Sequence, residues 1–248
     1  MLDLFDEPCS ETDGSLYANQ YPMRPHPCGK GHIITVPDGE LYYAPDFFEP
    51  RISDRAMDVL LANDRYPWQS TNWQEITDFS EIKWTNIAWQ QSMIQMYGRE
   101  LALPRLSAWH GDNDQTYTYS RIRLHPAPWN QILDWLRGQL TDVSGVHFNS
   151  VLLNWYRNGD DHISWHTDAE PELGRNPSIA SINFGATRRF ILRRSDDHQQ
   201  KIELPLKHGS LLIMSGALQH HWQHSVPKEK AVKASRVNLT FRVIKSIG

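Results

Sequence analysis

The second half of the chain is built from short stretches of strand-forming residues separated by turn signals. Gly159, Gly174, Gly185, Gly209 and Gly216 interrupt these stretches, and none of the stretches has the length or periodicity of a helix. Seven short strands without helices between them are typical of an antiparallel sandwich or jelly roll. The expected strands cover residues 147–156, 162–168, 179–184, 189–193, 201–206, 210–214 and 236–244.

Two helices are expected ahead of these strands. One covers 53–63 with Ser53 as its N-cap, and the other covers about 128–140. Strands and hairpins are expected over 68–105, where short apolar runs are broken by polar turns. Residues 1–40 are rich in Pro, Gly and Asp and lack periodicity, which predicts a flexible tail. We therefore expect one domain over 41–248 that is mainly β with flanking helices (α+β).

Composition excludes several classes of protein. The chain has 248 residues, of which 40% are hydrophobic, so it can bury a core, and no apolar run approaches the ~18 residues of a membrane span. The N-terminus is acidic and lacks the features of a signal peptide. The two cysteines, Cys9 and Cys28, argue against a disulfide scaffold or a zinc cluster. We expect a reducing compartment and no membrane association.

The stretch 162–168 carries a His-x-Asp pair. His166 and Asp168 are two residues apart in a strand-like run, so both side chains project from one face. Two histidines and one carboxylate form the facial triad of non-haem Fe(II) oxygenases, which leaves positions open for substrate and O₂. Two polar residues on a strand surface are the simpler alternative. Spacing alone does not choose the second histidine from the candidates His208, His220, His221 and His224.

The last strand alternates cleanly between apolar and polar residues. Arg236, Asn238, Thr240 and Arg242 share one face, and two arginines can bind a short dianion such as 2-oxoglutarate through paired hydrogen bonds. Taken alone, the pattern is more typical of an amphipathic strand with one solvated face. Together with the His-x-Asp strand, it favours a 2-oxoglutarate site, to which Asn154 and Tyr156 are suited to add neutral hydrogen bonds.

Six segments between about 104 and 243 occur in a characteristic order. They are Asn154-x-Tyr156, Trp165-His-Thr-Asp-Ala-Glu170, Ile179-Ala-Ser-Ile-Asn-Phe-Gly-Ala-Thr187, His208-Gly-Ser-Leu-Leu-Ile-Met214, Trp222-Gln-His-Ser-Val-Pro227 and Arg236-Val-Asn-Leu-Thr-Phe-Arg242. They resemble the AlkB family of Fe(II)- and 2-oxoglutarate-dependent dioxygenases, which remove N-alkyl lesions from nucleic acid bases. The resemblance is greatest to the AlkB homologue three branch, through Pro104-Arg-Leu-x-Ala-Trp, Tyr117-Thr-Tyr-Ser and Asp168-x-Glu-Pro-x-Leu-Gly-Arg175.

The resemblance implies a double-stranded β-helix, which is a jelly-roll fold. It implies His166, Asp168 and His224 as iron ligands, and it selects His224 by its Trp-x-His-x-x-Pro context. These three residues and Arg242 form the implied catalytic set. The positions that hold 2-oxoglutarate are matched by Asn154, Tyr156, Arg236, Asn238, Thr240 and Arg242. The implied substrate contacts are Tyr117, Thr118, Tyr119, Trp165 and Glu170, with nucleotide-recognition elements over about 66–125.

The implied activity is oxidative dealkylation of bases such as 1-methyladenine and 3-methylcytosine in DNA or RNA. It uses Fe(II), O₂ and 2-oxoglutarate and releases succinate, CO₂ and an aldehyde. The damaged base must first leave the stack. The expected partner is alkylated single-stranded DNA or RNA, and the protein is expected to be a monomer in the cytoplasm, or in the nucleus of a eukaryote.

Two other readings remain. A 2-oxoglutarate oxygenase with this fold can act on a protein or a small molecule, because the fold does not fix the substrate. A non-catalytic jelly-roll binding module is the third reading, and the intact His166, Asp168, His224 and Arg242 argue against it.

Some features bear on the form of nucleic acid. The net charge of −4 gives little general attraction to a duplex, which favours a single-stranded substrate. The resemblance implies an acid at the position of Ala169, and it places Tyr97 where the duplex-acting branch carries an aromatic finger, for which a core tyrosine is the simpler explanation. A local phosphate-binding face is the alternative to an ordinary solvated surface, which is the simpler interpretation. The candidates for such a face are Arg121, Arg123, Arg188, Arg189, Arg193, Arg194 and the lysines of 228–233.

Overall fold

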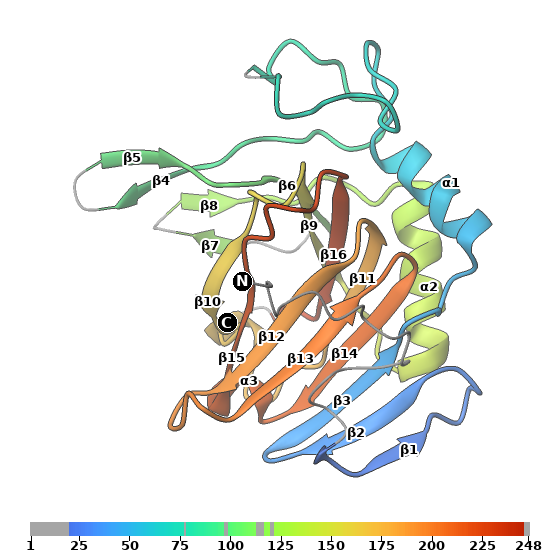
Figure 1. Ribbon diagram of the computed structural model, residues 1–248, viewed down its shortest axis with the longest axis vertical. Helices are drawn as coiled ribbons and strands as arrows, with labels where there is room; N and C mark the ends of the chain where they lie inside the picture. The colour runs from blue at the N-terminus through green and yellow to red at the C-terminus, as the bar shows by residue number, and fades with distance from the viewer. Residues whose placement is uncertain (1–19, 77, 97–98, 113–116, 120–121, 246–248) are drawn as a thin grey trace, which may run out of the picture.

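The computed structural model describes residues 20–76, 78–96, 99–112, 117–119 and 122–245. Two antiparallel sheets face each other in these ranges (Figure 1). The larger sheet has the strand order β1 (Met23–Pro25), β2 (His32–Val36), β3 (Gly39–Ala44), β14 (Ser210–Gly216), β11 (Ile179–Gly185), β16 (Arg236–Arg242), β9 (Ser150–Tyr156) and β6 (Leu106–Gly111). The smaller sheet has the order β10 (Ile163–His166), β15 (Trp222–Val226), β12 (Arg188–Arg194) and β13 (Lys201–Leu206).

Alternation along the strands divides the buried apolar side chains into two clusters. Leu212 and Met214 of β14 pack between the sheets, against Leu192 and Leu204 of the smaller sheet. Residues of opposite parity in the larger sheet pack against α1 (Pro50–Leu60) and α2 (Gln131–Ser144), which cover its outer face (Figure 1). Two facing antiparallel sheets with this division of the core make a jelly roll, which confirms the expected fold class.

Strand β16 has no solvated face. It pairs with β11 on one side and β9 on the other, and its first six residues are buried. Val237, Leu239 and Phe241 belong to the cluster beneath the helices. The polar residues of the strand therefore project into the space between the two sheets, and the solvated-strand alternative is wrong.

The structure corrects the expected N-terminal tail. Residues 20–40 contain β1 and β2, so the part of the expected tail that the structure describes is paired sheet rather than a flexible segment. The hairpin turn between β2 and β3 places Asp38 at a positive φ of 67°. The prolines and glycines of this stretch mark turns at a sheet edge, which a compositional argument cannot distinguish from disorder.

The helix boundaries shift by a few residues. Helix α1 begins at Pro50 and ends at Leu60, and Ser53 lies inside it with its hydroxyl bonded to the Glu49 carbonyl. Helix α2 begins after Asn130, whose side chain accepts from the Leu133 N–H and caps the helix. The one-turn helix α3 (Leu218–His221) and strand β15 are further elements that the sequence did not predict.

The segment before α2 is less regular than expected. It contains the hairpins β4 (Met93–Met96) with β5 (Arg99–Ala102) and β7 (Tyr117–Tyr119) with β8 (Ile122–Leu124), which project from the left of Figure 1, opposite the two long helices. Its earlier part packs through aromatic side chains onto β9, where the rings of Trp73, Trp84, Trp89 and Phe79 surround Trp155. None of the helices in the described ranges is long and apolar enough to cross a bilayer.

Candidate metal and 2-oxoglutarate site

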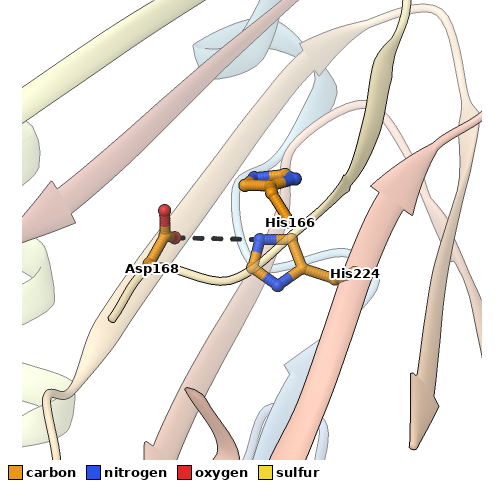
Figure 2. A group of neighbouring side chains, drawn as sticks. All are labelled: His166, Asp168 and His224. Atoms are coloured by element: carbon orange, nitrogen blue, oxygen red, sulfur yellow. Dashed lines mark ion pairs between the residues drawn. The ribbon is translucent and has the colours of Figure 1, made fainter. Parts of the chain in front are cut away.

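The His-x-Asp pair and one downstream histidine meet between the sheets (Figure 2). His166 ends β10 and lies directly across the ladder from His224 of β15, and their ring centroids are 4.2 Å apart. Asp168 lies two residues beyond β10, with its Oδ2 3.8 Å from His224 Nε2. One ligand atom from each residue falls within 4.8 Å of the others. This donor set fits a divalent metal and leaves coordination positions open.

The other three candidate histidines lie elsewhere. His208 accepts a hydrogen bond from the Gly185 N–H, and His221 lies 3.8 Å from Asp38. His220 is bonded to the Arg175 carbonyl. The geometry therefore brings together the set that the resemblance implied, which spacing alone had left open.

Burial dominates the ionisation of the site. Burial, followed by the neighbouring His166, lowers the pKa of His224 from the ordinary 6.5 to about 3, against the opposing attraction of Asp168. Burial also acts to raise the pKa of Asp168, but Arg242 and the two histidines outweigh it and hold that pKa below its ordinary value. His224 is therefore neutral and Asp168 ionised at neutral pH, which is the state that a metal requires of its ligands.

The lowered pKa of His224 predicts an acid-sensitive stability of the metal-free protein. Between pH 6.5 and about 3 the unfolded chain protonates this histidine while the folded chain does not. The contribution to the free energy of unfolding is therefore present above pH 6.5 and is lost as the pH falls, by at most about 1.4 kcal/mol per pH unit. Urea unfolding at pH 7.0, 5.5 and 4.5 measures this slope.

Other buried histidines share in this slope, since burial also lowers the pKa of His110. The comparison that isolates His224 is with His224→Asn, which cannot be protonated. Below pH 6.5, we expect the free energy of unfolding of the variant to fall less steeply with pH, by the contribution of about one proton. Identical slopes for the two proteins would contradict the assignment of a neutral, buried His224.

Strand β16 begins with a buried cation. Arg236 is 1% exposed, its guanidinium lies 4.9 Å from the Tyr156 ring, and its Nη2 donates to Asn183. Burial lowers its pKa from 12.5 to about 10, so it remains charged at neutral pH. Its Nε and Nη1 are buried and make no hydrogen bond of good geometry with the described residues, although the Tyr156 side chain is near enough to oppose the fall in the Arg236 pKa. Buried donors of this kind normally have partners, so they indicate an anionic ligand.

A second buried arginine near the same ring shows the contrast. Arg188 lies 5.8 Å from the Tyr156 ring, but all three of its nitrogens are used. Its Nε donates to Glu229, its Nη1 to the Asn158 carbonyl and its Nη2 to the Asp161 carbonyl. Arg188 therefore holds loops together through hydrogen bonds and is not part of a phosphate-binding face. Of the two arginines, only Arg236 has buried nitrogens left for a ligand.

Arg242, at the end of β16, contacts the proposed metal ligand Asp168. Its Nη2 donates to Asp168 Oδ1 over 2.6 Å, while its Nε is buried without a partner among the described residues. The remaining residues of this face are bonded to one another: Thr240 donates to Asn238, and Asn238 donates to Ser181. The result is a polar cradle along β16, with an arginine at each end and Asp168 at the Arg242 end, whose charge suits a dicarboxylate.

Asn154 and Tyr156 lie on β9 beside this cradle. Asn154 is the ladder partner of Asn238 and accepts from Arg105 Nε over 2.8 Å. Tyr156 is the ladder partner of Arg236. The geometry therefore brings together all six residues that were matched to 2-oxoglutarate. Sequence reasoning missed Asn183, which accepts from Arg236 and from Asn238; a polar residue within the apolar run 179–184 was the available signal.

The implied substrate contacts are less uniform. Trp165 points away from the metal candidates, because it neighbours His166 on β10; its ring stacks on Arg193 at 4.1 Å and lines a surface groove with Tyr21 and Ile191. Glu170 is half-buried and precedes the 3₁₀ turn Pro171–Leu173. The 117–119 segment forms β7, whose side chains are outside the described part of the structure, as is Tyr97.

The proposed phosphate-binding arginines are mostly engaged within the protein. Arg189 pairs with Glu203, Arg193 with Gln223, and Arg194 with Asp38 and Asp196. These guanidinium groups are paired within the protein, which does not favour a phosphate-binding face. Arg121 lies outside the described residues, as does the side chain of Arg123.

Comparisons with known proteins agree with this site. The family model of the 2OG-Fe(II) oxygenase superfamily matches residues 40–242. The chain therefore belongs to this superfamily, whose members use Fe(II) and 2-oxoglutarate. A solved structure of OsALKBH1 covers 85% of this chain and 99% of its own, with a TM-score of 0.52 and 13% identity, and so shares the fold.

Curated relatives confirm the resemblance to the AlkB family. The alpha-ketoglutarate-dependent dioxygenase alkB homolog 3 of Homo sapiens is 47% identical over 150 residues, which are 57% of this chain and 52% of that protein. The same figures hold for the protein of Bos taurus. The DNA oxidative demethylase ALKBH2 of Homo sapiens is 44% identical over 158 residues, which are 61% of this chain and 60% of that protein. The alignments thus span about half the length of the first two relatives.

Proposed function

We propose that this protein removes N-alkyl groups from nucleic acid bases in a reaction that depends on Fe(II), O₂ and 2-oxoglutarate. The observation that carries the proposal is a two-histidine, one-carboxylate cluster that Arg242 contacts through Asp168, on the same strand that carries the buried and unsatisfied Arg236. The cluster suits the metal and the cradle suits the cosubstrate. The nature of the substrate rests on the similarity to proteins named as AlkB homologues and a DNA oxidative demethylase.

Each group has a proposed task. His166, Asp168 and His224 hold Fe(II), which when bound with 2-oxoglutarate supplies the oxidising chemistry. Arg236 binds one carboxylate of 2-oxoglutarate, and Arg242 lies between Asp168 and the cradle, where it is suited to orient the other. Asn154, Tyr156, Asn238 and Thr240 shape the cradle. The hydrophobic cluster between the sheets, which includes Phe190 at 5.2 Å from the His224 ring, limits the access of water from that side.

Turnover on defined oligonucleotides tests the proposal. The substrate is one 1-methyladenine, 3-methylcytosine or etheno-adenine in matched single-stranded DNA, duplex DNA and RNA at fixed salt, because phosphate contacts are salt-sensitive. We expect succinate and aldehyde release only with the alkylated oligonucleotides. Succinate release that no alkylated nucleic acid stimulates, but that a protein or small molecule does, would favour the alternative 2-oxoglutarate oxygenase.

We further propose a preference for single strands. A single strand avoids most of the few kcal/mol that extraction of a base from a duplex costs, and the net charge of −4 gives little general attraction to a duplex. Repair of the same lesion should therefore be faster in the single strand than in the duplex. Equal or faster repair of the duplex would contradict this preference, and a selective loss of duplex repair in Tyr97→Ala would assign Tyr97 as a wedge.

A further inference from the structure

The carboxylate of the metal candidates lies on a segment that strand pairing does not hold. Strand β10 ends at His166, and its register with β15 is irregular between Ile163 and His166. Asp168 is two residues beyond the end of this ladder but is only 4% exposed. Its position therefore depends on contacts other than the ladder that fixes the two histidines opposite each other.

One of these contacts is a buried glutamine. Gln219 is 3% exposed, and its Oε1 accepts a hydrogen bond from the backbone N–H of Asp168 over 2.9 Å. Its Nε2 lies 3.6 Å from the sulfur of Met214 on β14. The glutamine thus connects the Asp168 backbone to the core beneath it, over a separation of 51 residues in the chain.

The element that carries Gln219 also leads into the strand that carries the second histidine. Helix α3 connects β14 directly to β15, and His224 follows Gln219 by five residues. Movement of α3 would therefore displace the Asp168 backbone and the start of β15 together. Arg242 holds the same aspartate from the other side, through Oδ1. The backbone contact and the side-chain contact together determine where the carboxylate points.

We infer that Gln219 is a positioning residue of the metal centre. Gln219 accepts a hydrogen bond from the backbone N–H of Asp168 and so holds the Asp168 carboxylate on the side of His166 and His224. Without this contact, the ion pair with Arg242 would decide where the carboxylate lies. This inference rests on the proposed metal centre. Groups that orient the ligands of a metal typically contribute about 10–100-fold to its affinity.

Binding of Mn(II) alone to the full chain tests the inference without turnover. Gln219→Leu removes the acceptor and should raise the Mn(II) dissociation constant by about 10–100-fold. Gln219→Glu keeps an oxygen that can accept from the Asp168 N–H and should retain affinity close to that of the wild type. If the leucine variant does not fold, Gln219→Asn takes its place, because its amide is one methylene too short to reach Asp168.

A neighbouring residue provides the matched control. Leu218 is 1% exposed on the same helix and belongs to the core cluster between the sheets. Leu218→Ala should lower the midpoint of thermal unfolding while leaving the Mn(II) dissociation constant unchanged. An equal loss of affinity in Leu218→Ala, unchanged affinity in the variant without the acceptor, or no recovery with glutamate would each overturn the inference.

The same titration distinguishes a failure of the proposed metal centre from a failure of the proposed role of Gln219. His166→Ala should lose Mn(II) binding altogether. Binding by His166→Ala equal to that of the wild type would contradict the proposed metal centre. Loss of binding in His166→Ala together with unchanged binding in the Gln219 variants would contradict the role of Gln219 alone.

Discussion

Replacement of His166 by alanine is expected to reduce turnover on alkylated oligonucleotides below detection while the protein stays folded. The side chain supplies one of only three donors to the proposed ion, and its ring is partly exposed, so its removal leaves little buried volume empty. The measurement combines succinate release with Mn(II) binding and circular dichroism. The same loss of turnover is expected for Asp168→Ala and His224→Ala.

These three variants should differ in stability even though they share the loss of activity. Asp168→Ala leaves Arg242 without its partner, and breaking a buried pair typically costs about 3–5 kcal/mol. His166→Ala has no such cost and is the cleanest of the three. His221→Ala is the matched control, because His221 is 44% exposed and lies near Asp38. Activity that survives in His224→Ala but is lost in His221→Ala would show that the wrong histidine was assigned to the metal.

The site illustrates how far the sequence reaches. The two-residue spacing of His166 and Asp168 is a local pattern, and the rule that alternate residues of a strand share a face was enough to pair them. His224 is remote, and four histidines were compatible with spacing alone. Its place is decided by the pairing of β15 with β10, which is a long-range contact, and the sequence reached it only through resemblance to a family.

The fold shows the same division between local and long-range information. Strand β16 was located correctly by its alternation, but alternation normally indicates one solvated face. The opposite holds here, because β9 and β11 flank the strand and the smaller sheet covers its polar face. Likewise, the Pro- and Gly-rich stretch 20–40 has the composition of a loop and becomes ordered by pairing onto β14 through β3.

The residues that support the site were the hardest to foresee. Asn183 and Gln219 carry no motif, and each acts through a hydrogen bond to a residue more than fifty positions away. Trp165 lies within the most informative motif, yet strand alternation directs it to the outer face of the smaller sheet, so motif membership alone did not predict its direction.

Replacement of Arg236 by methionine is expected to weaken 2-oxoglutarate binding by at least about tenfold. A hydrogen bond to a charged group is typically worth about 1.5–3 kcal/mol, and about 1.4 kcal/mol corresponds to tenfold. Arg236 is the better test of the cradle than Arg242, whose removal also releases Asp168 and so disturbs the metal. The measurement is a titration of 2-oxoglutarate in the presence of Mn(II).

In Arg236→Met, the free energy of unfolding without ligand should not fall, although the affinity for 2-oxoglutarate does. Arg236 is a buried cation with two unsatisfied nitrogens, so methionine, which is apolar and similar in volume, should leave the free energy of unfolding unchanged or raise it. At 100 times its dissociation constant, 2-oxoglutarate should stabilise the wild type by about 2.7 kcal/mol, and Arg236→Met should lose most of this effect at the same concentration.

Arg188→Met provides the contrast, because Arg188 is equally buried and uses all its nitrogens within the protein. Its replacement removes a donor from Glu229 and from three backbone carbonyls, those of Asn158, Asp161 and Pro227, so it should destabilise the ligand-free protein by about 3–5 kcal/mol. The two arginines contact the same tyrosine ring, yet they are expected to affect opposite quantities. If Arg236→Met instead destabilised the ligand-free protein as Arg188→Met does and left 2-oxoglutarate affinity unchanged, Arg236 would be a structural residue and the cradle would have to be assigned elsewhere.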